Sequence, residues 1–437
     1  MQPVQLLQQL LRIDTTNPPG AEAPAAELLR GFLDDAGADT LMHTSDAGRP
    51  SLIARVPGPP DVPALVLVSH TDVVAVERDS WTQDPFGGDL EGGFLWGRGA
   101  LDMKAIAVMH AAALAAIASA DAVPKREVIL MSFADEEAGG REGAEAVLRD
   151  IPERAGFGDG RPAPEALGEG AFGLSGILDR PLMPVVVAEK AVLWLDLIAT
   201  GDPGHGALPP ETQAIANLAR ALTKVAGHAA PRVHPVMKQQ FEILAANSSG
   251  VQAATFRALA SGVGSQVGRV LKKPLRRRGT IAALLSDTIT PTQIEGGYKH
   301  NVVPGEAKAS LDCRLLPDTD IAKLVAKMSR DLRKLGVTVQ EVSRHGGPVS
   351  SHTPLFDAIA HASRSMQESP VVVPSLTSGM TDLRFFRARG ATAYGWVPLV
   401  LDQQALATIH GHDERIEAAA FERAVEVMTQ VVRAVSL

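Results

Sequence analysis

Histidine and carboxylate side chains follow several apolar runs of the chain, in a pattern that could bind metal ions. The run from Ala64 to Ser69 ends in His70, and Asp72 comes two residues later. A His-x-Asp pair on an extended segment places both side chains on one face, because strand side chains alternate. A metal-bound imidazole needs an acceptor for its other ring nitrogen, commonly a carboxylate. A strand end whose histidine is merely hydrogen-bonded is the alternative.

Asp102 and two adjacent glutamates could add ligands and a base. Asp102 follows a glycine-rich turn, where its carboxylate could cap the next helix or bridge two metal ions. Glu136 and Glu137 follow the apolar run 127–133. Adjacent glutamates diverge, so one can bind a cation while the other faces a bound water, as a general base must. A solvated acidic turn is the alternative interpretation.

Two more candidates lie in later loops. Glu169 lies in the glycine-rich segment 156–176, and His410 follows the strand-like run 393–400. Each could instead be polar surface, and the nearby His412 is a second candidate imidazole. Together the loops favour a two-metal site, because two divalent ions balance three carboxylates and a bridging hydroxide in charge. Mixed histidine and carboxylate ligands suit zinc or cobalt better than magnesium or calcium.

The elements that must position these residues alternate between buried strands and helices. This alternation predicts an α/β fold with a mostly parallel sheet flanked by helices. Open α/β sheets bind ligands at the C-terminal ends of their strands, where the loops described above begin. Half-exposed strands and two helices in the middle of the chain predict a small α+β domain. We therefore expect a catalytic domain at 1–190 and 347–437, with a domain of 191–346 inserted into it.

Apolar periodicity also predicts the bounds of individual elements. Outside the insertion, the expected helices are 3–13, 22–36, 103–118, 141–150 and 417–435. Inside it, the expected strands are 192–200, 280–290, 306–316 and 337–343, and the expected helices are 211–227 and 319–335. The basic run from Lys272 to Arg278 is interpreted as a solvated face.

Composition excludes several classes of protein. A formal net charge of −8 argues against nucleic-acid and acidic-membrane binding. The single cysteine, Cys313, excludes an internal disulfide and a cysteine-ligated zinc. The sequence has no apolar run of about 18 residues and no signal-peptide pattern at its start, so we expect no membrane span and a cytoplasmic protein. No Gly-x-Ser-x-Gly sequence is present, which argues against a serine hydrolase.

The motifs together resemble those of the M20 metallopeptidases, the group of aminoacylases and carboxypeptidases. The likeness is carried, in order, by His70-Thr71-Asp72, Gly99-Ala100-Leu101-Asp102-Met103-Lys104, Asp135-Glu136-Glu137, Glu169 and His410-Gly411-His412-Asp413-Glu414. It runs through almost the whole chain and is closest to the carboxypeptidase S and N-acyl-amino-acid hydrolase branch. The resemblance implies a zinc-peptidase-like catalytic domain and a ferredoxin-like lid through which a homodimer forms.

The resemblance also implies a role for each site residue. One divalent ion, zinc or else cobalt or manganese, would be held by His70, Asp102 and Glu169, and a second by Asp102, Glu137 and His410. Asp72 would orient His70, and Glu136 would be the general base. The substrate would contact His205, Arg314, Asn301 and Gly379. In the family, the histidine that matches His205 reaches into the partner subunit's site. Arg314 and Asn301 resemble the groups that hold the substrate carboxylate and the oxyanion.

Departures from the family pattern leave alternatives open. The family often has Asp-Glu-Gly-Gly around the loop ligand, whereas Glu169 is followed by Gly170-Ala171, so Glu165 and Glu189 are the alternative ligands. Met380 stands where a second glycine is usual, which predicts a narrower pocket.

The expected function is hydrolysis of an amide bond beside a free carboxylate, in an N-acyl amino acid or a short peptide, by a metal-bound hydroxide and a glutamate base. Removal of a succinyl or carbamoyl group is an alternative chemistry of the same family. A non-catalytic binding module of the same fold is a further alternative. Its signature would be a missing ligand or a missing Glu136, and neither is missing.

Overall fold

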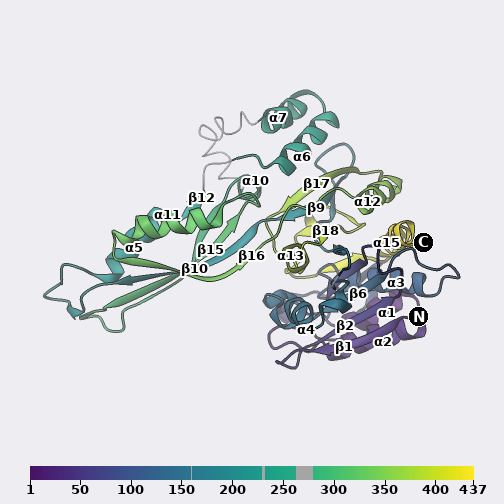
Figure 1. Ribbon diagram of the computed structural model, residues 1–437, viewed down its shortest axis with the longest axis horizontal. Helices are drawn as coiled ribbons and strands as arrows, with labels where there is room; N and C mark the ends of the chain where they lie inside the picture. The colour runs from purple at the N-terminus through teal and green to yellow at the C-terminus, as the bar shows by residue number, and fades with distance from the viewer. Residues whose placement is uncertain (159, 229–231, 262–278) are drawn as a thin grey trace. The chain divides into compact units, whose positions relative to one another are not determined.

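The computed structural model describes residues 1–158, 160–228, 232–261 and 279–437, which divide into two compact units (Figure 1). The first unit comprises Met1–Val187, Val349–Ser375 and Thr381–Leu437. The second unit comprises Ala188–Pro348 and Leu376–Met380. The catalytic and lid roles expected of these parts of the chain stay predictions.

Within the described residues, the first unit is built around a 10-stranded sheet. Its strands, in order across the sheet, are β1 (Asp39–Thr44), β2 (Pro50–Val56), β6 (Val128–Phe133), β3 (Leu65–His70), β7 (Glu165–Gly168), β18 (Thr392–Gly395), β9 (Leu182–Glu189), β8 (Gly173–Leu174) and β19 (Val400–Leu401), and β17 (Val371–Thr377) pairs with β9. The central neighbours β6, β3, β7 and β18 are parallel, whereas β1, β2 and β6 pair antiparallel. The predicted α/β fold class is confirmed.

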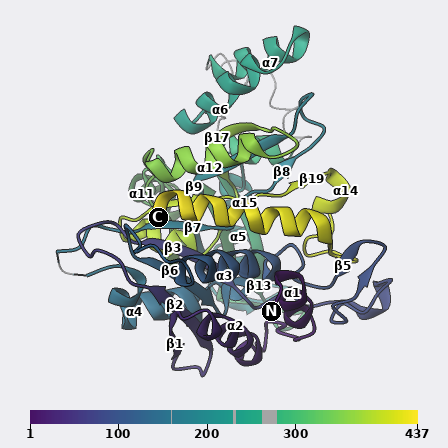
Figure 2. The same ribbon diagram turned by 90° about the vertical axis from the view of Figure 1, so that its right-hand side faces the viewer.

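Helices cover both faces of this sheet. They are α1 (Pro3–Leu11), α2 (Ala23–Asp35), α3 (Lys104–Ala118), α4 (Ala146–Asp150), α12 (Pro354–Ser365), α13 (Leu383–Ala388), α14 (Gln403–Leu406) and α15 (Ala418–Ser436). α3 packs on β3 and β6 and beside α15 (Figure 2), while Val66 and Val68 share a core with Phe386 of α13. Successive side chains of β3 point to opposite faces of the sheet, and all of them are buried, so both faces of the strand are covered. Only the end of the strand, at His70, is left for chemistry.

A small sheet joins two loops of the first unit. It consists of β4 (Leu90–Glu91), β5 (Phe94–Trp96) and β20 (Arg415–Glu417), with β5 in the middle. The antiparallel pairing of β5 with β20 ties the segment before Asp102 to the segment after His410.

The second unit contains a separate antiparallel sheet. Its strands, in order, are β12 (Gly227–His228), β13 (Thr288–Gly296), β15 (Glu306–Leu315), β10 (Ala191–Thr200) and β16 (Val337–His345). The other elements are β11 (Gly204–His205), β14 (Val302–Val303), α5 (Ala214–Val225), α6 (Pro235–Ala246), α7 (Gly250–Ala260), α10 (Gly279–Leu284) and α11 (Ile321–Arg333). α5 and α11 cover one face of this sheet (Figure 1), where Leu218 and Leu332 pack with alternate residues of β10 such as Leu195.

The predicted strand at 280–290 is wrong in its first half. These residues begin with α10, and the strand starts only at Thr288. The Ser286 hydroxyl donates to the backbone oxygen of Ala282 at 2.6 Å, as in a helical turn, and the alanine- and leucine-rich sequence favours that turn. The strand continues past Pro291 because its register shifts there, which accommodates a residue that cannot donate to the ladder.

The basic run from Lys272 to Arg278 lies outside the described residues. Among the residues that the structure describes, no helix has the length and apolar character needed to cross a membrane.

Candidate metal centre

His70 ends β3, and its two ring nitrogens face different partners. Nδ1 lies 3.0 Å from the backbone oxygen of Asp72 and 3.4 Å from its carboxylate. Nε2 lies 3.4 Å from Asp102 and 3.9 Å from Glu169. This Nε2 is buried and has no hydrogen-bond partner among the described residues. An imidazole that is held at one nitrogen and faces two carboxylates with the other has the arrangement of a metal ligand.

The loop before α3 presents Asp102, and a buried carboxylate fixes that loop. Glu414 accepts hydrogen bonds from the backbone N–H groups of Leu101 at 2.7 Å and of Asp102 at 3.1 Å. One oxygen of the Asp102 carboxylate lies 3.4 Å from Nε2 of His70, and the other lies 3.1 Å from Nε2 of His410. The N-cap of α3 is Met103. Asp102 therefore lies between two histidines instead of capping the helix.

A short 3₁₀ turn after β6 presents Glu136 and Glu137. Asp72 holds its backbone, because the Asp72 carboxylate accepts hydrogen bonds from the N–H groups of both glutamates at 3.1 Å. The same carboxylate accepts a 2.8 Å bond from the side chain of Asn17. Glu137 then lies 3.2 Å from Nε2 of His410. Sequence reasoning assigned Asp72 only to the histidine at the end of β3 and missed its contact with the acidic turn.

In the part of the chain that the structure describes, two groups of side chains could hold a metal ion. One is His70, Asp102 and Glu169, and the other is Asp102, Glu137 and His410, so the groups share Asp102. Within each group, the candidate ligand atoms lie within 4.8 Å of one another. Each group offers one imidazole and two carboxylates, a set that fits a divalent cation such as zinc. The structure thus brings together the five residues that the sequence singled out as ligands.

The alternative ligands Glu165 and Glu189 belong to neither group among the described residues. Glu165 begins β7, where its carboxylate pairs with Arg126 at 2.5 Å, and Glu189 belongs to the second unit. Glu169 directly follows the opposite end of β7 and faces His70. Because β3 and β7 are parallel, their C-terminal ends meet at one edge of the sheet and bring these two side chains together.

The charges around the two groups favour a bound cation. Burial alone would lower the pKa of His70, but its carboxylate neighbours, Asp102 first, raise that pKa well above its ordinary value. Hydrogen bonding to Asp102 and Glu137 raises the pKa of His410 to about 10. Burial and the charge of Asp102 raise the pKa of Glu169. Groups that stabilise added positive charge in this way suit a divalent ion, which would become the dominant local charge.

Glu136 lies beside the ligand groups but, among the described residues, is part of neither. Its burial raises its pKa well above the ordinary value, and the charge of His70 opposes that rise. A cation also faces it, since the Arg384 guanidinium lies 3.8 Å from its carboxylate. A general base for a metal-bound water must lie close to the metal ligands without being one of them, and Glu136 has this placement relative to the two candidate groups.

The residues expected to contact substrate lie in the second unit. His205 is in β11, which pairs with β14, and a 2.9 Å backbone hydrogen bond joins the residue after it to Asn301. Arg314 is on β15, where its Nε donates to the Asp312 carboxylate at 2.9 Å. The backbone N–H of Gly379 donates to a threonine hydroxyl two residues earlier. The roles of these residues stay predictions.

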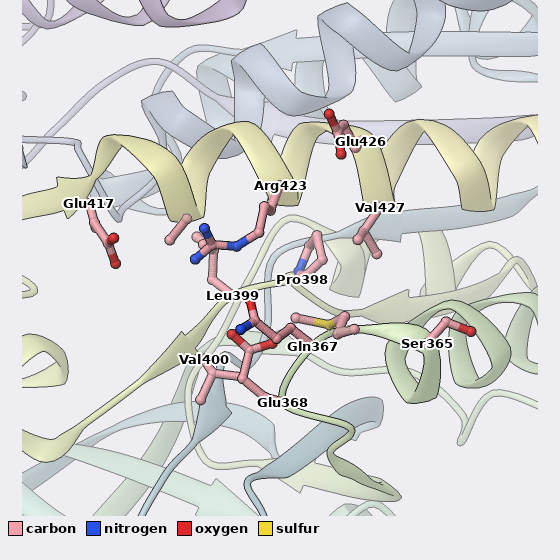
Figure 3. Close-up of a pocket in the computed structure, with 12 residues that line it drawn as sticks. Ser365, Gln367, Glu368, Pro398, Leu399, Val400, Glu417, Arg423, Glu426 and Val427 are labelled. Atoms are coloured by element: carbon pink, nitrogen blue, oxygen red, sulfur yellow. The ribbon is translucent and has the colours of Figure 1, made fainter.

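A separate pocket of about 240 Å³ lies beside α15 in the first unit (Figure 3). Its walls come from α15, from the loop after α12 and from the segment 398–400, and Figure 3 shows Arg423 reaching from α15 toward Leu399. None of the described residues that line it belongs to the two metal groups. The pocket therefore has no part in the candidate metal centre.

Comparison with known proteins gives the class of the molecule. The model of Peptidase family M20/M25/M40 matches residues 66–434, and the chain belongs to this family. The chain is 27% identical to Aminoacylase-1 of Mus musculus over 99% of its own length and 95% of that protein. It is 26% identical to the N-fatty-acyl-amino acid synthase/hydrolase PM20D1 of Mus musculus, over 86% of the chain and 74% of that protein. The chain is therefore a hydrolase.

Solved structures show the same fold. An M20 family metallo-carboxypeptidase from Sulfolobus solfataricus matches with a TM-score of 0.71 and 16% identity, covering 99% of both chains. A dinuclear metal binding peptidase of the M20 family from Bacillus subtilis matches with a TM-score of 0.61 and 13% identity, covering 99% of this chain and 97% of that one. At these identities the likeness is one of fold.

Proposed function

We propose that this hydrolase cleaves the amide bond of N-acyl amino acids or short peptides next to a free carboxylate. One observation carries the proposal: Asp102 lies between His70 and His410, with Glu136 beside the ligand groups and outside them. This arrangement suits two cations that share one carboxylate and leaves a second carboxylate free to move a proton. The aminoacylase and acyl-amino-acid hydrolase names of the relatives support the substrate class.

The cofactor that we propose is a pair of divalent ions, zinc by preference and cobalt or manganese as substitutes. His70, Asp102 and Glu169 would hold one ion, and Asp102, Glu137 and His410 the other. When bound, the pair would polarise the scissile carbonyl and make a water molecule more acidic. Two histidines and three carboxylates match the ligand preference of zinc better than the all-oxygen preference of magnesium.

The chain's own groups would then move the protons and hold the substrate. Glu136 takes a proton from the attacking water and delivers it to the leaving nitrogen, while Asp72 keeps the turn that carries Glu136 in place. His205 donates to the carbonyl oxygen as negative charge develops there, and its neighbour Asn301 assists. Arg314 pairs with the substrate carboxylate through its guanidinium fork, and Gly379 contributes a backbone contact.

We further propose that the chain acts as a cytoplasmic homodimer formed through the second unit, in which His205 of one subunit serves the metal centre of the other. His205 ends the short strand β11, between two glycines, and it is exposed and outside the first unit, which supports this arrangement.

A release assay tests the proposed function. The purified protein is given zinc and a panel of N-acyl amino acids, dipeptides, N-succinyl and N-carbamoyl amino acids, and each acid is matched with its carboxamide. We expect turnover of N-acyl amino acids or dipeptides and a strong preference for the acid over the carboxamide. Equal turnover of acid and carboxamide would remove the free carboxylate from the proposal, and turnover of succinyl or carbamoyl compounds alone would replace its substrate class.

A further inference from the structure

A buried arginine contacts the turn that carries the adjacent glutamates. Arg384 is in α13 and is only 3% exposed. One terminal nitrogen donates to the backbone oxygen of Gly139 at 2.6 Å, and the other donates to the backbone oxygen of Thr381 at 2.7 Å. Gly139 directly follows the 3₁₀ turn Glu136–Ala138, so the first bond ties that turn to α13.

The same guanidinium faces two carboxylates. Its nitrogen lies 3.8 Å from Glu136 and 3.8 Å from Asp382. Asp382 is buried, and neither of its oxygens has a hydrogen-bond partner among the described residues. A β-carbon added at Gly140 would lie 2.5 Å from Asp382, so the turn and α13 are in close contact. Buried charges of this kind need a partner of opposite sign, and Arg384 supplies it to both carboxylates.

The acidic turn is therefore held at both of its ends. The Asp72 carboxylate accepts the N–H groups of Glu136 and Glu137 at the start of the turn. Arg384 donates to the carbonyl at its end and faces the Glu136 side chain from the side. The Glu137 side chain is directed to His410 instead. The two contacts leave little freedom to the backbone between them.

We propose that Arg384 is a positioning residue that sets the place of the Glu136 carboxylate, an inference that rests on the proposed function of Glu136 as the base. A glutamate side chain has several rotatable bonds, and proton transfer requires it to stay within hydrogen-bond reach of the water. A misplacement of about 1 Å can cost about 10²-fold in rate. Arg384 prevents this by fixing the turn and by attracting the carboxylate.

The test compares two buried arginines of one helix. Arg384→Lys keeps the charge but loses the planar fork that serves Gly139 and Thr381 together. Arg387→Lys is the matched control, because Arg387 is equally buried in α13 and donates to backbone oxygens of β9 and β18 instead. We expect Arg384→Lys to lower kcat by about 10- to 100-fold, the range for groups that orient others, with KM and metal content unchanged. Arg387→Lys should leave kcat near the wild-type value.

A double-mutant cycle tests whether Arg384 acts through Glu136. In a Glu136→Gln background, Arg384→Lys should cause little further loss of kcat, because the group that it positions is gone. Multiplicative losses in the double variant would overturn the proposal. If Arg384→Lys does not fold, Arg384→Gln takes its place, since its amide can still donate to Gly139. Failure of both to fold would make Arg384 a residue of the fold alone and would also overturn the proposal.

Amide hydrogen exchange gives a readout that does not depend on catalysis. Exchange at residues 136–140 should become faster in Arg384→Lys and stay at the wild-type rate in Arg387→Lys. Unchanged exchange at these residues in Arg384→Lys would contradict the proposal whatever the activity. If the wild type hydrolyses no compound of the panel, the proposed function is rejected. Faster exchange in Arg384→Lys would in that case still show that Arg384 positions the turn.

Discussion

Glu136 and Glu137 are neighbours of the same residue type with different surroundings. Glu137 lies 3.2 Å from His410 and is one of the candidate ligands. Glu136 lies outside both ligand groups and faces Arg384. Their backbone N–H groups donate to the two oxygens of one carboxylate, Asp72, while their side chains face different partners. This divergence is the physical basis for assigning one glutamate to the metal and the other to the proton.

Substitution of each glutamate separates these two tasks. Glu136→Gln should keep the fold and both metal ions and lower turnover by about 10²–10⁴-fold, the range for loss of a general base. Glu137→Gln should instead weaken the binding of one ion, because an amide is a poorer ligand than a carboxylate. Turnover and metal content per chain, measured on both variants, would show the division. Identical behaviour of the two variants would contradict it.

The side chains that gather at the candidate metal centre were easier to predict from the sequence than the residues that hold them in place. His70, Asp102, Glu137 and their partners were visible because each follows an apolar run and matches an ordered motif. The sequence showed Glu414 only as part of a motif, and it did not show that Glu414 accepts hydrogen bonds from the loop that carries Asp102. The contact of Arg384 with Gly139 was also not visible. Such residues act on backbone groups of distant segments, and no local spacing encodes those contacts.

At the scale of elements, α3 shows how the first unit supports the site. The helix begins two residues after Asp102 and is buried along most of its length, because it lies between the sheet and α15. His110 lies in this buried stretch, fully covered, with neither ring nitrogen hydrogen-bonded among the described residues. Burial lowers its pKa from 6.5 to about 3. The folded protein therefore holds His110 neutral at pH values where the unfolded chain protonates it.

This buried histidine should make the fold sensitive to acid. Its contribution to stability is present above pH 6.5 and is lost as the pH falls toward 3, and between pH 7 and pH 5 the loss is about 2 kcal/mol. When the pH is lowered from 7 to 5, we expect the unfolding free energy of His110→Leu to fall by about 2 kcal/mol less than that of the wild type. Denaturant unfolding at both pH values measures it, with His361→Leu on the exposed side of α12 as the control. An equal loss in His110→Leu and wild type would contradict the prediction.

Element bounds were predictable where burial is periodic and less so where it is not. β10 and β15 alternate between buried and half-exposed residues and were found close to their observed bounds. The segment 280–290 was assigned as one strand, but its short apolar run from Ile281 to Leu285 does not distinguish a strand from a helical turn. The difference between α10 and β13 depends on contacts such as the bond between Asp287 and the N–H of Leu316, which lies far along the chain.

At the scale of the whole molecule, the predicted dimer can be tested by complementation. A His205→Ala subunit is mixed with a Glu136→Gln subunit, each nearly inactive alone, since loss of one oxyanion donor costs about 10²–10³-fold. In the mixed dimer, one site combines an intact Glu136 with an intact His205 from the neighbouring subunit. Activity should therefore return to about half of the wild-type value per mixed dimer. Verified mixed dimers that stay inactive would show that His205 acts within its own chain or not at all.

Removal and return of the metal tests the central claim most directly. The protein is dialysed against a chelator, its metal content is measured by elemental analysis, and zinc is then added in steps while hydrolysis of an N-acyl amino acid is followed. We predict no turnover in the metal-free protein and recovery that is complete at two zinc ions per chain, because the ligand groups joined by Asp102 must both be filled. Full turnover in protein verified to contain no metal would contradict the account.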